Sequence, residues 1–243
     1  MNVEEYERMY HLEDSYWWFV GRHNLVLGFL RTKYGARTDL RILDIGCGTG
    51  AMSRKLSGLG TVVSADFSRL ALEFSKRRDL KLLCASDAVR LPFRDSVFDI
   101  VVALDTLEHV RDDQSALCEF QRVLKPGGRV IATVPAYQSL WSQHDVALMH
   151  FRRYVAGEVR ERFATAKLRI EKLSYAMTLL FPIVWLYRRW TRRHQGPAKA
   201  SLVFVPALIN RLLVGLLTGE NAILRVVTLP FGVTVFCMAE RPS

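Results

Sequence analysis

The feature that most constrains this chain is a glycine-rich segment near residue 45. A short apolar run from Ile42 to Ile45 ends in three glycines at alternate positions, Gly46, Gly48 and Gly50. Because glycine has no Cβ atom, the backbone there can take left-handed dihedral angles and come close to a bound molecule. The pattern predicts a buried strand that leads into a ligand-binding turn, although an ordinary strand-to-helix connection also collects glycine.

A second apolar run, residues 61–66 (TVVSAD), ends in Asp66, about 20 residues after the glycine-rich turn. An acidic residue about 20 positions beyond such a turn is placed to accept hydrogen bonds from ribose hydroxyls. The two segments together predict a nucleoside site. A dinucleotide dehydrogenase would show G-x-G-x-x-G, and that spacing is absent from the turn.

Five segments follow in a fixed order across roughly residues 40 to 135: LDIGCGTG, SADFS, SDAVRLPF, FDIVVALDTLEHV and RVLKPGG. This order resembles class I S-adenosylmethionine-dependent methyltransferases of the type 11/12 kind. The resemblance implies a Rossmann-like, doubly wound α/β fold with a seven-stranded, mostly parallel sheet, whose last strand inserts antiparallel beside the sixth. It also implies S-adenosyl-L-methionine as the cofactor. WWFxGR near the start and HxRRY after the fifth strand resemble a bacterial subgroup found with lipid-linked glycan enzymes.

Short apolar runs and the turn signals between them predict the order of elements. We expect strands near 41–45, 61–66, 80–85, 97–103, 128–134, 168–175 and 232–239, and helices near 23–35, 50–58, 68–78, 112–124 and 157–165. The KPGG turn at 125–128 should end the helix before it, and a loop should follow residue 135. The predicted divisions are 1–35, 36–175, 176–228 and 229–243, with the second as the cofactor-binding core.

The resemblance assigns cofactor contacts to residues at the carboxyl ends of the strands. The methionine portion would lie against the glycine turn, the ribose against Asp66 and the adenine against Phe67, with Asp87 at the adenine amino edge. Asp87 could instead cap a turn. The expected cofactor-binding set is Arg22, Asp44, Gly46, Cys47, Gly48, Asp66, Phe67, Ser68, Asp87, Ala88, Leu104 and His109.

The segment LDTLEHV is the first polar group on the acceptor side. Asp105 and His109 are four residues apart, which places them on one face of a helical turn. His109 could deprotonate a hydroxyl, since imidazole titrates near neutral pH, or it could contact the cofactor or cap a helix. Asp105, Glu108 and His109 resemble the set proposed to hold a divalent metal in some quinone methyltransferases, but we expect no metal.

A second polar group, HDVALMHFRRY, follows the fifth predicted strand. His144, Asp145, His150 and Tyr154 are candidate catalytic bases, and Arg152 with Arg153 could clamp an acceptor phosphate or carboxylate by paired hydrogen bonds. The alternative is that this segment only packs the loop on the sheet and leaves its arginines in water.

The first 35 residues are rich in large aromatic side chains that need a partner to pack against. Trp17, Trp18 and Phe19 precede Arg22 in the segment YWWFVGR. In methyltransferases that this chain resembles, such a segment folds over the cofactor. That makes Arg22 a candidate for the methionine carboxylate and Trp18 a candidate substrate contact. A helix held to the core by its tryptophans is the alternative.

Residues 176–228 stand where the fold needs only a short connection, and they are apolar and basic. The run AMTLLFPIVWLYRRW is shorter than a span of about 20 apolar residues and contains Pro182, and SLVFVPALINRLLVGLL is interrupted by Pro206, Asn210 and Arg211. We expect helices in a bilayer interface, with arginines toward lipid phosphates: Arg188, Arg189, Arg192 and Arg193. A lid over a hydrophobic pocket or a dimer interface is the alternative.

The charge of the chain is concentrated in its last part. Residues 1–150 hold 19 Lys or Arg and 19 Asp or Glu, whereas residues 151–243 hold 15 and 5, so the net charge of +10 comes from the second part. A region that is both basic and apolar suits a membrane surface better than nucleic acid. The charge and the apolar residues of this region together predict a peripheral contact with the inner membrane face.

Cysteine usage and the N-terminal residues predict the compartment. Cys47, Cys84, Cys118 and Cys237 are far apart and form neither a zinc motif nor a disulfide framework. Cys47 should serve as a small residue beside the cofactor rather than as a reactive thiol. The acidic start, with Glu4, Glu5 and Glu7, lacks the zones of a signal peptide, so we expect the cytoplasm.

These observations predict a methyltransferase that transfers methyl to oxygen on a lipophilic or lipid-linked acceptor, such as a glycan or a quinone. The alternative is a soluble methyltransferase acting on a small molecule or peptide, with the insert as a lid. A binding module without turnover is a hypothesis of another class. The order of motifs does not identify the acceptor atom or the oligomeric state.

Overall fold

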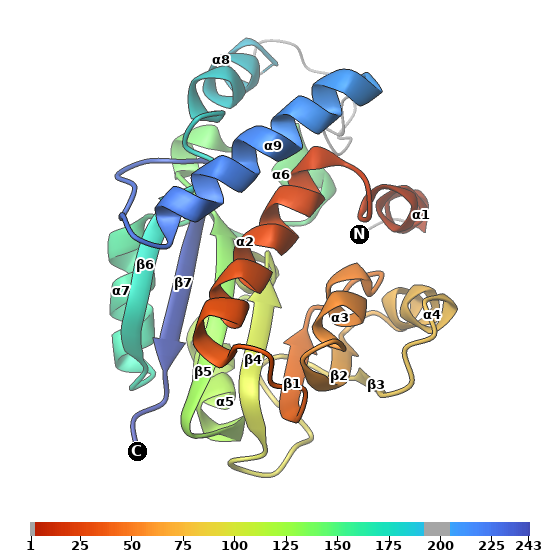
Figure 1. Cartoon of the computed structure of the whole chain (residues 1–243), viewed down its shortest axis with the longest axis vertical. Helices are drawn as coiled ribbons and strands as arrows, with labels where there is room; N and C mark the ends of the chain where they lie inside the picture. The colour runs from red at the N-terminus through yellow and green to blue at the C-terminus, as the bar shows by residue number, and fades with distance from the viewer. Residues whose placement is uncertain (1–2, 192–204) are drawn as a thin grey trace.

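A computed structural model describes residues 3–191 and 205–243 of the chain and places seven strands in one sheet (Figure 1). The strands lie in the order β3-β2-β1-β4-β5-β7-β6, and β7 pairs antiparallel with both β5 and β6. The predicted fold class and the antiparallel last strand are therefore confirmed. The strand bounds are β1 Leu40–Ile45, β2 Gly60–Asp66, β3 Leu83–Ala85, β4 Phe98–Leu104, β5 Leu124–Pro135, β6 Arg169–Ala176 and β7 Thr234–Glu240.

The central strands are buried on both faces, as their nearly continuous apolar sequences predict. In β4, Ile100 to Ala103 are fully or almost fully buried, and in β1 only Arg41 is exposed. Strands with one solvated face would alternate apolar and polar residues. The sheet consequently needs a helical layer on each side.

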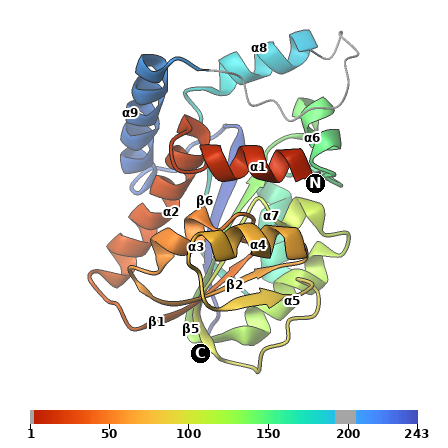
Figure 2. The ribbon, with the colours of Figure 1, turned by 90° about the vertical axis from the view of Figure 1, so that its right-hand side faces the viewer.

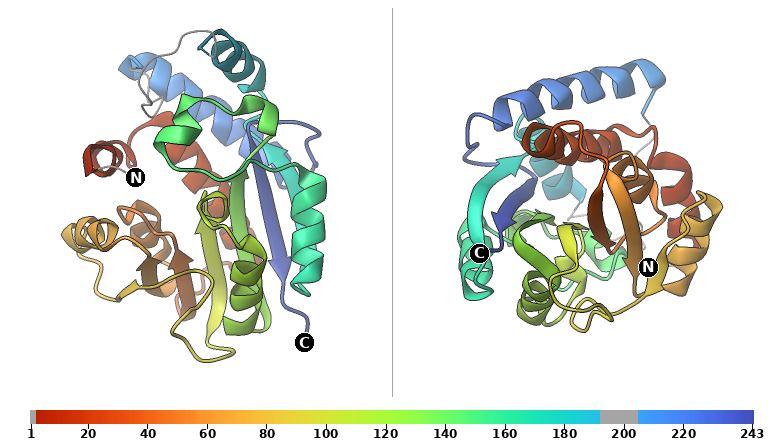
Figure 3. Two further views of the ribbon diagram at one scale, coloured as in Figure 1. Left: turned by 180° about the vertical axis from the view of Figure 1, so that it is seen from behind. Right: turned by 60° about the horizontal axis from the view of Figure 1, so that its bottom comes forward.

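Helices cover both faces of this sheet (Figure 3). Side chains of α2 and α3 pack on one face, and side chains of α5 and α7 pack on the other. The α4 helix lies along β2 and β3 at the edge (Figure 2). The helix bounds are α1 Val3–Leu12, α2 Trp17–Tyr34, α3 Ala51–Leu56, α4 Arg69–Arg77, α5 Asp113–Val123, α6 Gln143–Ala147, α7 Ala156–Thr165, α8 Phe181–Thr191 and α9 Ala207–Leu224.

Three expectations about local structure are wrong. The third strand begins at Leu83, not near residue 80, and the KPGG segment starts β5 rather than forming a separate turn, although Gly127 does take a positive φ of 75°. The predicted loop after β5 contains the short helix α6. A capping box between Ser142 and Asp145 starts that helix.

The N-terminal 35 residues serve two purposes. The first half of this segment reaches over the end of the sheet, whereas the second half of α2 is part of the core, with Leu25, Val26 and Leu30 buried. Phe29 of α2 stacks on Phe236 of β7, with ring centroids 4.6 Å apart. The interpretation of residues 1–35 as a cofactor cover therefore fits only their first half.

The insert before β7 forms α8 and α9, which lie beyond the end of the sheet where the parallel strands finish (Figures 1 and 2). The α9 helix packs on α2. The amide of Asn221 donates to the carbonyl of Gly21 over 2.9 Å, and a Cβ added at Gly21 would come within 2.3 Å of Leu217. Glu220 caps the start of the insert by accepting hydrogen bonds from the backbone of Thr178 and Leu179.

Length and composition alone would allow α9 to cross a membrane, and 22% of that helix is buried in the fold. We expected the interruptions at Pro206, Asn210 and Arg211 to prevent a span, and the 18 residues of α9 pass the test in spite of two of them; a core helix can pass the same test. Arg192 and Arg193, which we expected to face lipid, lie outside the described residues.

Candidate cofactor and acceptor site

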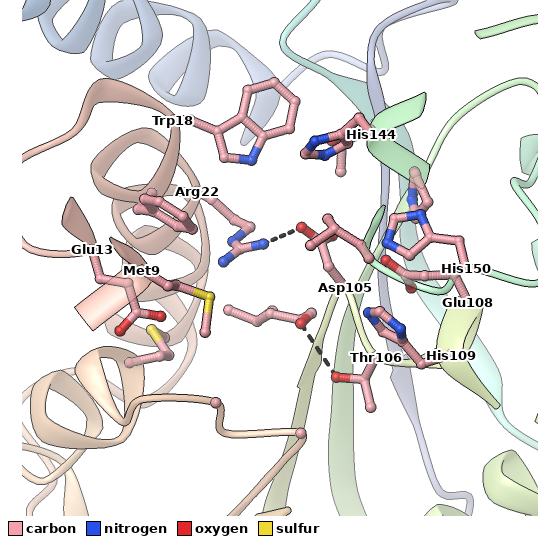
Figure 4. Close-up of a pocket in the computed structure, with 18 of the residues that line it drawn as sticks. Met9, Glu13, Trp18, Arg22, Asp105, Thr106, Glu108, His109, His144 and His150 are labelled. Carbon is pink, nitrogen blue, oxygen red and sulfur yellow. Dashed lines mark hydrogen bonds and ion pairs between the residues drawn. The ribbon is translucent and has the colours of Figure 1, made fainter. Parts of the chain in front are cut away.

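A cavity of about 1090 Å³ opens at the carboxyl ends of the parallel strands. Its floor is the glycine turn and the ends of β2 and β4, and its walls come from α1, α2, α6, α8 and α9 (Figure 4). Small-molecule sites in α/β sheets lie at this edge, and the volume is at the upper end of what a single ligand needs. The cavity therefore has room for a nucleoside and for a second molecule.

The glycine turn lines the cavity because its backbone takes conformations that other residues avoid. Gly46 and Gly48 have φ angles of 71° and 55°. A Cβ added at Gly46 would lie 2.3 Å from the hydroxyl of Thr106, which itself bonds the carbonyl of Ile45. A Cβ at Gly48 would lie 2.9 Å from the terminal carbon of Met9. Both positions therefore need glycine.

Asp66 holds the turn and the start of α4 together. One of its carboxylate oxygens accepts from the amide of Gly48 over 3.0 Å, and the other accepts from the amide of Ser68 over 2.8 Å. Each oxygen retains a lone pair on the cavity side for a ribose hydroxyl. Phe67 is 79% exposed at the rim, where an adenine ring would cover it.

Asp87 does what its alternative interpretation predicts. Its carboxylate accepts a hydrogen bond from the amide of Val89 over 3.1 Å, which caps a turn. Both Asp87 and Ala88 also line the cavity, so the cap leaves them within reach of an adenine edge. The assignment of these two residues to adenine stays a prediction.

Three carboxyl groups gather on the cofactor side, of which Asp44 and Glu13 are buried and Asp66 is half-buried. Burial raises the pKa of Asp44 to about 7, despite a hydrogen bond from Ser53, and it also raises the pKa of Glu13 and of Asp66. Each of these shifts means that negative charge is poorly compensated. S-adenosylmethionine carries a sulfonium and an ammonium group, so the residues present fit this cofactor.

Cys47 lies between these carboxyl groups but is not positioned to react. It is only 6% exposed, and burial raises the pKa of its thiol well above the ordinary value, with Asp44 and Asp66 adding to the rise. A thiol kept protonated is a poor nucleophile. This favours the interpretation of Cys47 as a small residue beside the cofactor.

Arg22 reaches across the cavity from α2 to Asp105 (Figure 4). The other oxygen of Asp105 accepts from the hydroxyl of Thr133 over 2.8 Å. Arg22, Asp105 and Trp18 all line the cavity. Arg22 and Asp105, however, are paired with each other. A ligand carboxylate would have to share Arg22 with Asp105, and Asp105 is already engaged on both oxygens.

The histidines on the acceptor side are uncharged at neutral pH. Partial enclosure by the cavity walls and then the nearby His150 lower the pKa of His109, although its side chain stays exposed, and burial followed by the charge of Arg188 lowers the pKa of His144 to about 3. Both rings line the cavity. They can accept a proton but are weak bases.

Asp145 is the centre of a buried network rather than a catalytic base. It accepts from the ring of His150 over 2.9 Å and from the guanidinium of Arg153 over 2.7 Å, and Arg188 lies 3.2 Å away. Although burial opposes it, these partners hold the pKa of Asp145 well below its usual range. Our expectation that Asp145 removes a proton is wrong, because its carboxylate is stabilised as the anion and does not line the cavity.

The arginine clamp that we expected is also wrong. Arg153 is 5% exposed and is occupied by Asp145 and by the carbonyl of Ala136, while Arg152 binds the carbonyl of Arg111 outside the cavity. Arg188 binds the carbonyl of Leu140 instead of facing lipid.

Tyr154 does not reach the cavity either. Its hydroxyl donates to Asp113 over 2.7 Å, and burial raises its pKa far above the ordinary value. HxRRY therefore packs its loop on the sheet, as the alternative interpretation held, but Arg153 is buried rather than left in water. Both His150 and Arg153 line the cavity.

Sequence reasoning missed the part of the cavity that α1 and the turn after it supply. Glu13 is buried against the hydroxyl of Thr49, just beyond the glycine turn. Arg78 fixes this segment by donating to the carbonyls of Thr49 and Tyr10, over 2.8 and 2.7 Å, and by pairing with Asp14. No motif marks Glu13 or Arg78, since their contact joins elements 65 positions apart.

Comparison with known proteins agrees with this geometry. Residues 43–132 match the family model described as a methyltransferase domain. The demethylmenaquinone methyltransferase of Staphylococcus aureus (strain MRSA252) is 36% identical, over 44% of this chain and 51% of that protein. The ubiquinone/menaquinone biosynthesis C-methyltransferase of Pseudomonas syringae pv. syringae is 39% identical, over 46% and 48%.

A solved S-adenosylmethionine-dependent methyltransferase from Thermotoga maritima shares the fold, with a TM-score of 0.59 at 18% identity over 98% of this chain and 96% of that one. The chain spans about half the length of the curated relatives that it matches. S-adenosyl-L-methionine is the cofactor of the matched domain. Residues 43–132 thus match a methyltransferase domain, and the sheet built around them has the fold of a solved S-adenosylmethionine-dependent methyltransferase.

Proposed function

We propose that the chain is an S-adenosylmethionine-dependent methyltransferase acting on a lipophilic, quinone-like acceptor at the cytoplasmic surface of a membrane. One observation supports this most strongly: a single cavity joins the glycine turn to a wall of apolar side chains. That wall consists of Trp17, Trp18, Ile183, Val184, Ile209 and Leu213. The names of the curated relatives refer to quinone biosynthesis, which is consistent with an apolar acceptor.

When bound, the cofactor supplies a methyl group already activated by its sulfonium, so the protein mainly aligns the acceptor and excludes water. The glycine turn and Asp66 would hold the nucleoside, while Asp44 and Glu13 would balance the positive charge. His109, which is neutral because its pKa is about 4, would take the proton from an acceptor hydroxyl. Loss of that proton makes the oxygen, or a ring carbon conjugated to it, nucleophilic.

The membrane contact is a separate part of the proposal and is supported by the outer face of α9. Leu208, Leu212 and Leu216 recur every four residues and are 70%, 65% and 41% exposed, while Leu213 and Leu217 face inward. Trp190 on α8 is also exposed. Such a stripe, with the exposed Arg211 on the same helix, suits the interface of an anionic bilayer.

The acceptor class is tested with methyl-labelled S-adenosylmethionine offered to the lipid and aqueous fractions of one bacterial extract. We expect label in the lipid fraction with the wild-type chain and none with Asp66→Ala. Label only in the aqueous fraction would support the soluble alternative. In that alternative the insert is a lid, which agrees with the lining of the cavity by α8 and α9. Label in neither would indicate a binding module. Nuclear magnetic resonance of the product then tells oxygen from carbon methylation.

Flotation with vesicles that contain anionic lipid tests the membrane contact. The triple variant Leu208→Gln, Leu212→Gln, Leu216→Gln should remain with the soluble fraction, whereas the wild type floats. A matched control, Leu82→Gln with Val155→Gln, changes exposed apolar residues away from α9 and should float. If neither form floats, the insert is a lid only, and if both float, the membrane contact does not depend on this stripe.

A further inference from the structure

The proposed reaction gives no role to the buried carboxyl group of Glu108. Its side chain is fully buried, and within residues 3–191 and 205–243 neither carboxylate oxygen has a hydrogen-bond partner. A buried carboxyl group without a partner costs on the order of 1–3 kcal/mol or more, so native proteins rarely keep one without a reason. The nearby arginines do not resolve this, because Arg22 binds Asp105 and Arg153 binds Asp145.

Two imidazole rings stand beside this carboxylate. Donor atoms of Glu108, His109 and His150 all lie within 4.8 Å of one another, and the two rings meet edge to face with centroids 4.7 Å apart. Figure 4 shows the carboxylate between the rings, at the edge of the cavity. Nitrogen and oxygen ligands of one metal ion, each about 2.1 Å from it, sit between about 3 and 4 Å apart, so closing the site needs movements of about 1 Å.

Both histidines are oriented as metal-binding histidines usually are. The Nδ1 atom of His150 is hydrogen-bonded to Asp145 over 2.9 Å, which leaves Nε2 toward the cavity. The ring of His109 is hydrogen-bonded to the backbone of Met149. A carboxylate or a carbonyl on the far nitrogen fixes the tautomer and the direction of the lone pair of a ligating histidine. Arg153 and Arg188 in turn hold Asp145 in place.

We propose that Glu108, His109 and His150 bind one divalent transition-metal ion. Two imidazoles and one carboxylate suit zinc, iron(II) or manganese(II) rather than magnesium, which prefers oxygen ligands. The set differs from the one that the sequence suggests, because Asp105 is engaged by Arg22 and Thr133 and His150 takes its place. His150 lies outside the matched domain, residues 43–132. Open coordination positions would face the cavity.

The proposal concerns metal binding and does not depend on the acceptor. While the ion is bound, His109 is a ligand and does not serve as the proton acceptor described above. Untagged protein is purified, stripped with a chelator and titrated with Zn²⁺ by calorimetry and with Co²⁺ by visible absorption. We expect one ion per chain for the wild type. His109→Ala and His150→Ala should each weaken binding more than about 100-fold, since the loss of an outer partner alone costs 10- to 100-fold. His109 borders the cavity, so its variant should fold normally.

The matched control is His144→Ala, which removes another histidine from the same cavity wall but from outside the cluster. It should bind Zn²⁺ and Co²⁺ as the wild type does. Thermal melting of each variant separates lost binding from lost folding. The proposal is overturned if folded wild-type chain binds neither ion, or if His109→Ala binds them as tightly as the wild type. Either result leaves the cofactor assignment untouched, because no cofactor is present in the titration.

Discussion

Asp44 and His144 line the same cavity, yet the two sides that they represent are electrically opposite. On the cofactor side, burial raises the pKa of Asp44 to about 7 and also that of Glu13, so the site favours a positive ligand. On the acceptor side, burial lowers the pKa of His144 to about 3, and the pKa of the more exposed His109 is lowered as well, so these rings stay neutral. The two sides would therefore suit ligands of different charge, a positive cofactor and the uncharged acceptor that we propose.

The two sides also differ in how they are built. The cofactor side rests on backbone conformation in one continuous segment, Gly46 to Gly50, with Asp66 tied to it. The acceptor side is assembled from α2, the 3₁₀ turn at Leu107–His109, α6 and the insert, and is held by the side-chain network of Asp145. Substitutions on the first side should affect cofactor binding, and substitutions on the second should affect stability and transfer.

The largest expected effect is on the cofactor side. Gly46→Val should weaken binding of S-adenosylhomocysteine by more than about 100-fold, because a Cβ there would press on Thr106 and the left-handed φ of 71° is costly for a branched residue. Isothermal calorimetry measures this. Gly157→Ala, at an open helical position, is the control and should bind normally. Normal binding by Gly46→Val would contradict the description of the turn.

The next effect concerns stability on the acceptor side. Arg153→Met should lower the free energy of unfolding by about 3 kcal/mol, since it leaves the buried Asp145 short of a partner. Arg152→Met, its more exposed neighbour, should cost less than about 1 kcal/mol. Urea unfolding compares the two. Equal losses would mean that Asp145 does not depend on Arg153.

A smaller and pH-dependent effect separates the two sides further. The pKa of Asp44 is raised from its unfolded value to about 7, so the folded state holds its proton more tightly and this contribution to stability is lost as pH rises from 4 to 7. Asp44→Asn, which keeps an acceptor for Ser53, should be no more stable than wild type at pH 5. At pH 8, without cofactor, it should be more stable by up to about 3 kcal/mol. Thermal melting across this range is the measurement, and a pH-independent difference would contradict the buried charge.

Sequence alone predicted the cofactor side because its signals are local. Three alternate glycines, an acidic residue at the end of the next strand and nearly continuous apolar strands each follow from backbone conformation and burial. The order of strands and the antiparallel β7 followed from the family that these motifs resemble. The α1 contacts of Glu13 and Arg78 were missed, since nothing local marks them.

The acceptor side could not be predicted in the same way. HxRRY suggested free arginines and a free tyrosine, but each of these groups has a partner distant in sequence: Asp113 for Tyr154 and the carbonyl of Arg111 for Arg152. The roles of these side chains depend on partners that the fold brings to them, which the local sequence does not show. Which side of the insert faces inward was likewise set by packing of α9 on α2, through Leu217 and Asn221, and not by its composition.

The central claim, that the cavity has separate cofactor and acceptor sides, is tested most directly by one calorimetric series with S-adenosylhomocysteine. Asp66→Ala should raise the dissociation constant by at least about tenfold, because it removes charged hydrogen bonds that hold the turn and the ribose site. His144→Ala should bind within about twofold of the wild type. Unchanged binding by Asp66→Ala, or an equal loss in both variants, would contradict the account.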